Sequence, residues 1–370
     1  EMLFIDPETC IDCGACMDAC PVDAIHYEDD LPDSQARFRA INAEYFHRHP
    51  LQTGTYPAIV KHGRVEPGVL RVAIVGAGPA ACYAADALID IEGVEVSLFE
   101  KLPTPFGLVR AGVAPDHQRT KSVVSVFERA LSSKRLAAYF NVEVGRDIRH
   151  EDLLRHHHAV IYAMGMSQSK SLEIPGEQLP GSHAASEFVA WYNGHPDHRQ
   201  HRFDLSGPRA VIVGNGNVAL DVARVLLADT TNLARTDISD DALNSLQDSA
   251  VDEVVILGRR GLREAAFSVG EFLALGKLDG VDVLIEGEDD LEPKPDDDFE
   301  TSVKLELARE YMERPSTAGH KRIVFRFRTR PVEVVGSDRV TGVRLASTTT
   351  GQNGAGASSS EQDSEMLSTS

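Results

Sequence analysis

Four of the five cysteines lie close together near the start of the chain. Cys10, Cys13, Cys16 and Cys20 follow the pattern C-x-x-C-x-x-C-x-x-x-C, and Pro21 comes directly after it. Thiolates at this spacing can wrap an iron–sulfur cube while N–H groups of the loop point at its sulfurs, whereas the two halves of a zinc site usually lie about a dozen residues apart. The run therefore predicts an iron–sulfur cluster, with a zinc knuckle as the alternative.

A glycine-rich turn with a carboxylate behind it follows further along the chain. Gly76, Gly78 and Ala81 form G-x-G-x-x-A between a strand-like run and a helical pattern. Glycines there allow a tight turn and let the backbone approach a pyrophosphate at the positive end of the helix. Glu100 ends the next strand-like run, where a carboxylate accepts from both ribose hydroxyls and repels a 2′-phosphate. The unit predicts a site for FAD or NAD(H).

A second glycine-rich turn ends in the opposite charge. Gly214, Gly216 and Ala219 repeat the pattern, but the strand-like run VVILG that follows leads into Arg259 and Arg260. Two guanidinium groups can grip a 2′-phosphate through charge-assisted hydrogen bonds. The unit therefore predicts an NADP site, and a solvated basic turn is the alternative.

Each turn must be positioned by a βαβ pattern. The first consists of RVAIV, a helical run from Pro79 and VEVSLFE, and the second of RAVIV, a helical run from Asn217 and VDEVVILG. The buried-strand pattern HAVIYAMG lies between them. Short apolar runs that alternate with helical patterns are typical of parallel sheets covered by helices. The sequence thus predicts two dinucleotide-binding folds in series.

Composition excludes several classes of protein. The chain has 370 residues and a net charge of −20, which argues against nucleic acid because most of the surface would repel phosphates. Its longest apolar runs are strand length, far below the roughly 20 residues of a membrane span. Clustered cysteines favour a metal site in a reducing compartment, which predicts a cytoplasmic location. No leader-like pattern precedes the first motif, and we expect that Glu1 is not the native start.

Several stretches resemble a known family, the adrenodoxin-reductase type of ferredoxin–NADP reductase with a fused bacterial ferredoxin. They are LPTPFGLVRAGVAPDHQRTKS, GNGNVALDVAR, GRRG and FVAWYN. The resemblance implies an α/β fold with two Rossmann-like domains, for FAD and NADP, preceded by a small α+β ferredoxin-like segment. It also implies that NADPH gives a hydride to FAD, which exchanges single electrons with a fused or separate ferredoxin.

The resemblance also implies site residues. FAD would contact Ala80, Glu100, Leu108 and Val144; NADP would contact Lys170, Asn215, Gly216, Asn217, Val218, Arg259, Arg260 and Glu271. His117, in APDHQ, would lie near the isoalloxazine, and His117 and Glu271 are the residues implied for catalysis. Lys170 stands where the family often has arginine. Ala274 stands where it often has a second carboxylate, so a proton relay through a carboxylate pair near Glu271 is not expected.

The cysteine run itself resembles the second cluster motif of a two-cluster ferredoxin. In such motifs the fourth cysteine serves the other cluster, so the resemblance implies that Cys20 pairs with ligands upstream. We then expect a three-iron cluster or no cluster in place of a stable four-iron cluster. Trp191 is the only tryptophan, so the GW segment that closes over the flavin in this family is not found. Both observations predict a chain truncated at its two ends.

The expected domain boundaries follow from these patterns. We expect a ferredoxin half-domain at 1–30, a linker at 31–69, the FAD domain at 70–168, an incomplete NADP domain at 169–346, and a disordered low-complexity tail at 347–370. Residues 287–300 predict a solvated acidic loop and not a site for a basic partner. The run His156 to His158 predicts a solvated strand entrance and not a metal site.

Two other functions remain open from the sequence alone. The same folds could form the electron-input subunit of a larger iron–sulfur flavoenzyme of the glutamate-synthase kind. The chain could also be an inactive docking fragment. A disulfide reductase needs a redox cysteine pair beside the flavin, and Cys82 has no partner cysteine near it in the sequence, so we expect Cys82 to be a packed small hydrophobe.

Overall fold

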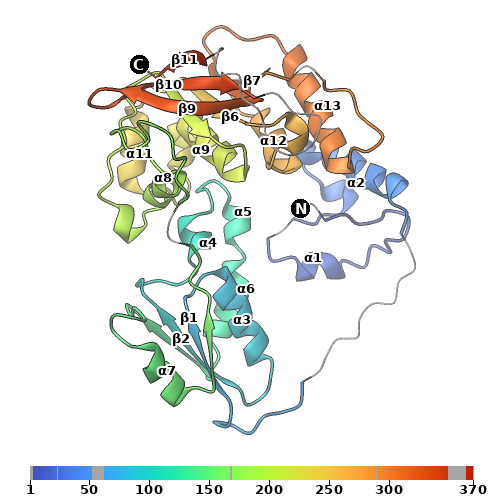
Figure 1. Cartoon of the computed structure of the whole chain (residues 1–370). Helices are drawn as coiled ribbons and strands as arrows, with labels where there is room; N and C mark the ends of the chain where they lie inside the picture. Colours follow the sequence, from blue (N-terminus) through green and yellow to red (C-terminus); the bar gives the residue numbers. More distant parts are fainter. Residues whose placement is uncertain are drawn as a thin grey trace. The chain divides into compact units, whose positions relative to one another are not determined.

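The structure is a computed structural model that describes residues 3–22, 24–51, 62–166, 169–288, 290–348 and 364–369 (Figure 1). It forms two compact units. One comprises residues 4–113 and 117–168, and the other comprises residues 169–370 with the short segments 1–3 and 114–116. Among the described residues, no helix combines the length and the apolar composition that crossing a bilayer demands.

The cysteine-rich segment is followed by a helix that the sequence did not predict. Helix α1 (Ala15–Ala19) and the short turns η1 (Glu28–Asp30) and η2 (Asp33–Gln35) precede α2 (Arg37–Arg48). The Tyr45 ring of α2 stacks on Phe4 with ring centroids 3.9 Å apart, and the Asn42 side chain exchanges two hydrogen bonds with the backbone of Ile5. Residues 37–48 of the stretch expected to be a linker therefore form a helix, which is stabilised by contacts with residues 4–5.

The first unit contains a parallel sheet in the order β3-β2-β1-β4. Its strands are β1 (Arg71–Val75), β2 (Glu95–Glu100), β3 (Leu136–Phe140) and β4 (Ala159–Tyr162). The helices are α3 (Pro79–Ile89), α4 (Leu108–Ala111), α5 (Gln118–Lys121), α6 (Val124–Leu131) and α7 (His150–His156). Alternate residues of β1 face opposite sides, since Ile74 packs with the α3 side and Val75 packs with Leu153 of α7.

The second unit repeats this architecture with the order β5-β6-β8-β7, again parallel. The strands are β5 (Arg209–Val213), β6 (Glu253–Leu257), β7 (Val281–Glu286) and β8 (Lys321–Arg326). The helical elements are α8 (Ala185–Tyr192), η3 (Pro196–His198), α9 (Asn217–Leu227), α10 (Thr230–Leu233), α11 (Asp240–Gln247), η4 (Leu262–Glu264), α12 (Val269–Leu275) and α13 (Phe299–Glu313). The prediction of an α/β chain with two Rossmann-like folds is confirmed.

An antiparallel sheet covers one face of the second parallel sheet (Figure 1). It consists of β9 (Thr329–Gly336), β10 (Val340–Ser347) and β11 (Ser364–Ser368). The expected disordered tail at 347–370 is therefore corrected for residues 364–368, while residues 349–363 lie outside the described part. Strand β11 completes the edge of β10, and Arg326 binds Glu365 at 2.6 Å.

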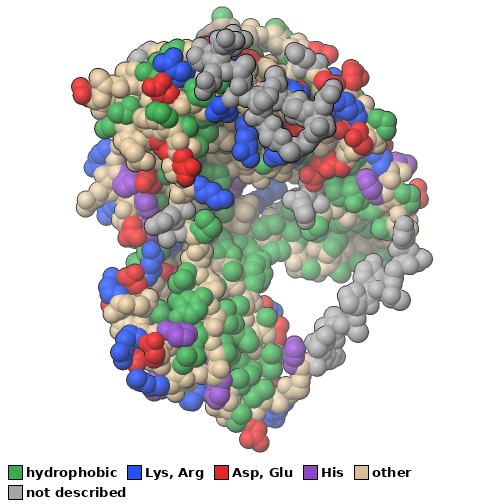
Figure 2. All heavy atoms as spheres, in the orientation of Figure 1, with side chains coloured by type: hydrophobic (Ala, Val, Ile, Leu, Met, Phe, Trp, Pro, Cys, Tyr) green, Lys and Arg blue, Asp and Glu red, His purple; other side chains and the backbone are tan. Residues whose placement is uncertain are grey.

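The acidic stretch 287–300 is also different from the expectation of a solvated loop. Glu288 and Leu291 are buried, Asp297 forms an ion pair with Arg263, and Asp298 caps α13 by accepting from the Thr301 N–H. The local composition is that of a solvated loop, but basic side chains from other segments and N–H groups of the backbone give these carboxylates partners. Elsewhere, on the face shown in Figure 2, acidic and basic side chains are interspersed.

Candidate cofactor-binding sites

The first glycine-rich turn joins β1 to α3. Gly76 has φ +104°, and a Cβ there would lie 2.5 Å from the carbonyl oxygen of Ala163, so only glycine fits. Gly78 is the N-cap of α3, with no side chain occupying the cap. Ala80 is exposed in the first turn of the helix, whereas Ala81 is fully buried. The open N–H groups at this helix end can receive a pyrophosphate.

Glu100 lies at the end of β2 and is buried, with 8% of its surface exposed. Its Oε2 accepts from the Ala77 N–H at 2.8 Å, and its Oε1 accepts from the Leu102 N–H at 2.9 Å. The Glu100 carboxylate therefore holds the glycine-rich turn in place through hydrogen bonds within the protein. Each oxygen keeps a further lone pair, so the same group can still accept from a ribose hydroxyl.

Apolar side chains lie exposed near this turn. Leu108 at the start of α4 is 68% exposed, and Tyr162 at the end of β4 and Met164 beyond it are 46% and 66% exposed. Val144 is half-buried and packs against the β1 face that carries Val75. These exposed apolar side chains lie beside a turn that can receive a pyrophosphate. Together they suit a cofactor that has a flat, mostly apolar ring and a phosphate group.

Cys82 lies in α3 behind the same turn. It is buried, and its thiol donates to the Ala77 carbonyl at 3.5 Å. Burial, and secondarily the negative charge of Glu100, raise the pKa of the Cys82 thiol to about 11. The thiol is a neutral packing group, as the sequence predicted.

The second glycine-rich turn joins β5 to α9. Gly214 has φ +109°, and a Cβ on Gly214 or Gly216 would meet no atom within 4 Å, so the space in front of the turn is open. Asn217 accepts from the Ser268 N–H at 2.8 Å, which ties α9 to the start of α12. Asn215 lies beside Gly258, Val218 is 51% exposed and Ala219 is buried. An open turn with fixed walls can accommodate a second dinucleotide.

Arg259 and Arg260 follow β6 and are exposed. Their backbone carbonyls are bound, Arg259 by the Thr348 hydroxyl at 2.5 Å and Arg260 by the Arg328 N–H at 3.1 Å. Within the described part of the chain, neither guanidinium group has a hydrogen bond or an ion pair with a carboxylate. Lys170 is also exposed, in the segment after β4. The two arginine heads are therefore available to an anion.

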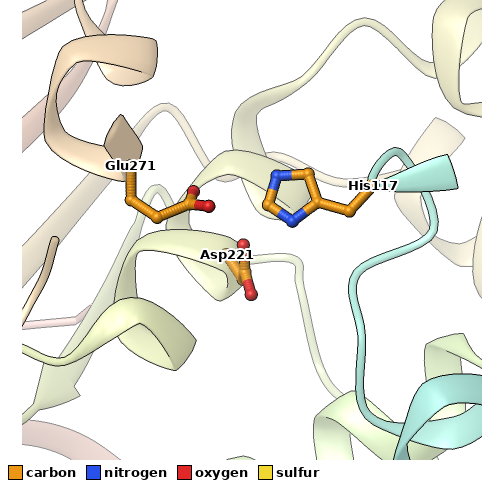
Figure 3. Close-up of side chains that lie close together, drawn as sticks. All are labelled: His117, Asp221 and Glu271. Atoms are coloured by element: carbon orange, nitrogen blue, oxygen red, sulfur yellow. The ribbon is translucent and has the colours of Figure 1, made fainter. Parts of the chain in front are cut away.

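A carboxylate pair lies between α9 and α12 (Figure 3). One oxygen of Asp221 and one of Glu271 lie within 4.8 Å of each other, and both side chains are half-buried. Arg224, which is 6% exposed, pairs with Asp221 and donates to Asp116 at 2.8 Å. The sequence had offered no second carboxylate near Glu271 because position 274 is alanine. The structure supplies one from another helix, α9.

Asp221 is the site residue that the sequence analysis missed. It lies four residues after Asn217 on α9, so both side chains share one face of the helix. The four-residue spacing from Asn217 is the sequence pattern from which Asp221 could have been predicted. His117 is placed on the turn at the start of α5, where it is the N-cap residue (Figure 3).

The cysteine run fits a cluster site. All four cysteines are free thiols, with Cys10, Cys13 and Cys16 exposed and Cys20 half-buried. Cys20 Sγ accepts from the Ala24 N–H at 3.3 Å, the kind of bond that stabilises the sulfurs of a cluster.

Two family models match the chain. A 4Fe-4S binding domain matches residues 3–26, and the pyridine nucleotide-disulphide oxidoreductase model matches residues 70–260. The first match agrees with the prediction that the cysteine run binds an iron–sulfur cluster. The second covers both glycine-rich turns and extends to the two arginines.

Relatives with curated names and solved structures agree with the two family matches. A "Probable ferredoxin/ferredoxin--NADP reductase" of Mycobacterium leprae is 45% identical over 95% of this chain and 65% of its own length. "NADPH-ferredoxin reductase FprA" of Mycobacterium tuberculosis is 47% identical over 73% of this chain and 61% of its own. The structure "Mycobacterium tuberculosis FprA in complex with NADPH" has a TM-score of 0.77 at 42% identity and covers 82% of this chain and 69% of that one.

The chain thus has two Rossmann-like folds, each with a glycine-rich turn of the dinucleotide-binding type, and a segment that matches a ferredoxin-type model. The chain belongs to the pyridine nucleotide-disulphide oxidoreductase family. It spans somewhat less than two thirds of the length of the curated relatives it matches, 65% in the Mycobacterium leprae case. Its relatives are named as ferredoxin–NADP reductases, in agreement with the resemblance seen in the sequence.

Proposed function

We propose that this chain is the FAD- and NADPH-binding part of an NADPH-dependent ferredoxin reductase. The observation that carries the proposal is the pair of exposed guanidinium groups beside the second glycine-rich turn, in a chain of this family. Arg259 and Arg260 would bind the 2′-phosphate that distinguishes NADPH from NADH. Lys170 would add a point charge to the same ligand.

The first unit would hold FAD. Gly76, Gly78 and the N-terminus of α3 would receive the pyrophosphate, and Glu100 would accept from the ribose. Leu108 and Val144 would line the ring side of the site. Bound FAD would convert the two-electron hydride of NADPH into single electrons for an iron–sulfur acceptor.

The carboxylate pair of the second unit would orient the nicotinamide. Asp221 and Glu271 supply acceptors to the carboxamide N–H groups of a nicotinamide, which fixes the face that the ring presents. In the first unit, His117 would lie near the isoalloxazine. None of these groups needs to form a covalent bond with the substrate.

The cysteine segment would make the electron partner part of the same chain. Cys10, Cys13, Cys16 and Cys20 would hold iron–sulfur clusters, and a separate ferredoxin is a second possible partner. Four cysteines that are clustered within eleven residues favour a metal site in a reducing compartment, which supports a cytoplasmic location.

The test is steady-state reduction of an artificial acceptor by NADPH and by NADH. Replacing both Arg259 and Arg260 by Ala should raise the KM for NADPH by about a hundredfold, since each lost bond to a phosphate contributes roughly 1.5–3 kcal/mol. The KM for NADH should stay within about twofold. Arg235→Ala, an exposed arginine beyond α10, is the matched control and should change neither value. Equal losses for the two cofactors would refute the assignment.

A further inference from the structure

Four backbone groups of the turn after β6 are held by other segments of the chain. Thr329 N–H donates to the Gly258 carbonyl at 3.0 Å, and the Thr348 hydroxyl donates to the Arg259 carbonyl at 2.5 Å. Arg328 N–H donates to the Arg260 carbonyl at 3.1 Å. The Leu262 N–H donates to Oε2 of Glu288 at 2.8 Å. The turn that carries the two arginines is thus fixed along its whole length.

Glu288 is the charged group in this arrangement. It is 5% exposed, and its second oxygen accepts from the Arg328 guanidinium at 2.9 Å. Its Oε2 lies so close to the turn that a Cβ on Gly261 would come within 2.7 Å of it. A buried carboxylate with two donors is costly to disturb, because removing it leaves a buried N–H and a guanidinium without their partner.

Arg328 joins this carboxylate to the arginine turn. Its guanidinium binds Glu288 while its backbone N–H binds Arg260, and its own carbonyl accepts from the Thr348 N–H at 2.7 Å. Arg328 has φ +51°, which is uncommon for a residue with a side chain and shows that these contacts determine its conformation. Residues 262, 288, 328 and 348 come from four separate segments.

We propose that Glu288 and Arg328 are positioning residues for 2′-phosphate recognition. They hold the backbone from which the Arg259 and Arg260 side chains project, so that less conformational entropy is lost when both guanidinium groups close on one phosphate. The inference rests on the proposed NADPH function. It adds that discrimination between NADPH and NADH depends on an ion pair between the buried Glu288 and the partly exposed Arg328, which does not itself touch the ligand.

The experiment is calorimetric titration of the chain with adenosine 2′,5′-bisphosphate and with AMP, which lacks the 2′-phosphate. Glu288→Leu should weaken binding of the bisphosphate about tenfold, equal to about 1.4 kcal/mol, and leave AMP within twofold. Glu288→Gln keeps an acceptor for the Leu262 N–H and should recover part of the loss. Glu292→Leu, in the same acidic stretch with an 84% exposed side chain, is the matched control and should change nothing.

Two further variants keep the inference falsifiable if Glu288→Leu fails to fold. Arg328→Met and Thr348→Val remove one contact each and should lower the ratio of bisphosphate to AMP affinity by about threefold or more. An unchanged ratio in folded Glu288 and Arg328 variants, or an equal loss for both ligands, would overturn the positioning role. If the wild-type chain itself binds the two ligands equally, the proposed NADPH function fails instead.

Discussion

The two glycine-rich turns follow the same sequence pattern but use the charge at the next strand end in opposite ways. At the first turn, Glu100 is buried and its two oxygens accept from backbone N–H groups. At the second, Arg259 and Arg260 are exposed and only their backbone carbonyls are bound. One charge is part of the turn's own structure, and the other two charges project from the turn into solvent.

This difference teaches that a charged residue at a strand end can hold the following turn itself or leave that role to another segment. Glu100 fixes the first turn itself, because a carboxylate is an acceptor and the turn offers N–H donors. Arginine has no acceptor, so the second turn needs a separate carboxylate, Glu288, to bind the Leu262 N–H. The same fold thus requires one acidic residue at the first turn and a basic pair with a buried acidic support at the second.

The largest effect is expected from removing the Glu100 carboxylate. Glu100→Leu leaves two backbone N–H groups without acceptors, at about 1–3 kcal/mol each, and removes the ribose acceptor. Bound flavin per protein should fall at least about tenfold, and the midpoint of thermal unfolding should decrease. Glu95→Leu, at the start of the same strand, is the control and should retain flavin. A normal flavin content in Glu100→Leu would show that the Glu100 carboxylate is not needed to hold the first turn in a flavin-binding conformation.

A smaller effect is expected when the first glycine of either turn, Gly76 or Gly214, is replaced by alanine, and the loss of folding stability should differ between the two. Gly214→Ala meets open space, so it should cost only the strain of a positive φ, about 1–2 kcal/mol. Gly76→Ala adds a clash with the Ala163 carbonyl and should cost about 1–3 kcal/mol more. Denaturant unfolding of the two variants measures both values. Equal losses in the free energy of unfolding would show that the backbone of the first turn shifts to accommodate the added methyl group.

The smallest effect concerns Cys82, whose pKa of about 11 depends in part on the Glu100 charge. At pH 8 about one thousandth of this thiol is ionised, so alkylation should modify the other cysteines and spare Cys82. Because the folded pKa is above the usual value of about 9, the folded state should lose stability from Cys82 only as the pH rises from 9 towards 11. Mass spectrometry of alkylated protein, with urea-unfolded protein as the control, tests this; rapid labelling of folded Cys82 would contradict it.

Local patterns were sufficient for the elements that carry the turns. Runs such as RVAIV and RAVIV, each followed by glycines and a helical pattern, predicted β1, α3, β5 and α9 because apolar periodicity and glycine spacing lie within a few residues of each other. Helix α2 and strand β11 were missed. Each depends on a partner segment, residues 4–5 for α2 and β10 for β11, and the local sequence of neither shows that partner.

The sequence alone determined the cysteine spacing, the two dinucleotide turns and the charges at the ends of their strands. These depend on residue type and on separations of a few positions, which backbone geometry converts directly into loops and helix ends. Only the tertiary structure decided that Asp221 lies beside Glu271 and that Glu288 is a buried support, not part of a solvated loop. Glu288 binds residues 26 and 40 positions away, and only packing of the folded chain brings such distant groups within hydrogen-bond distance.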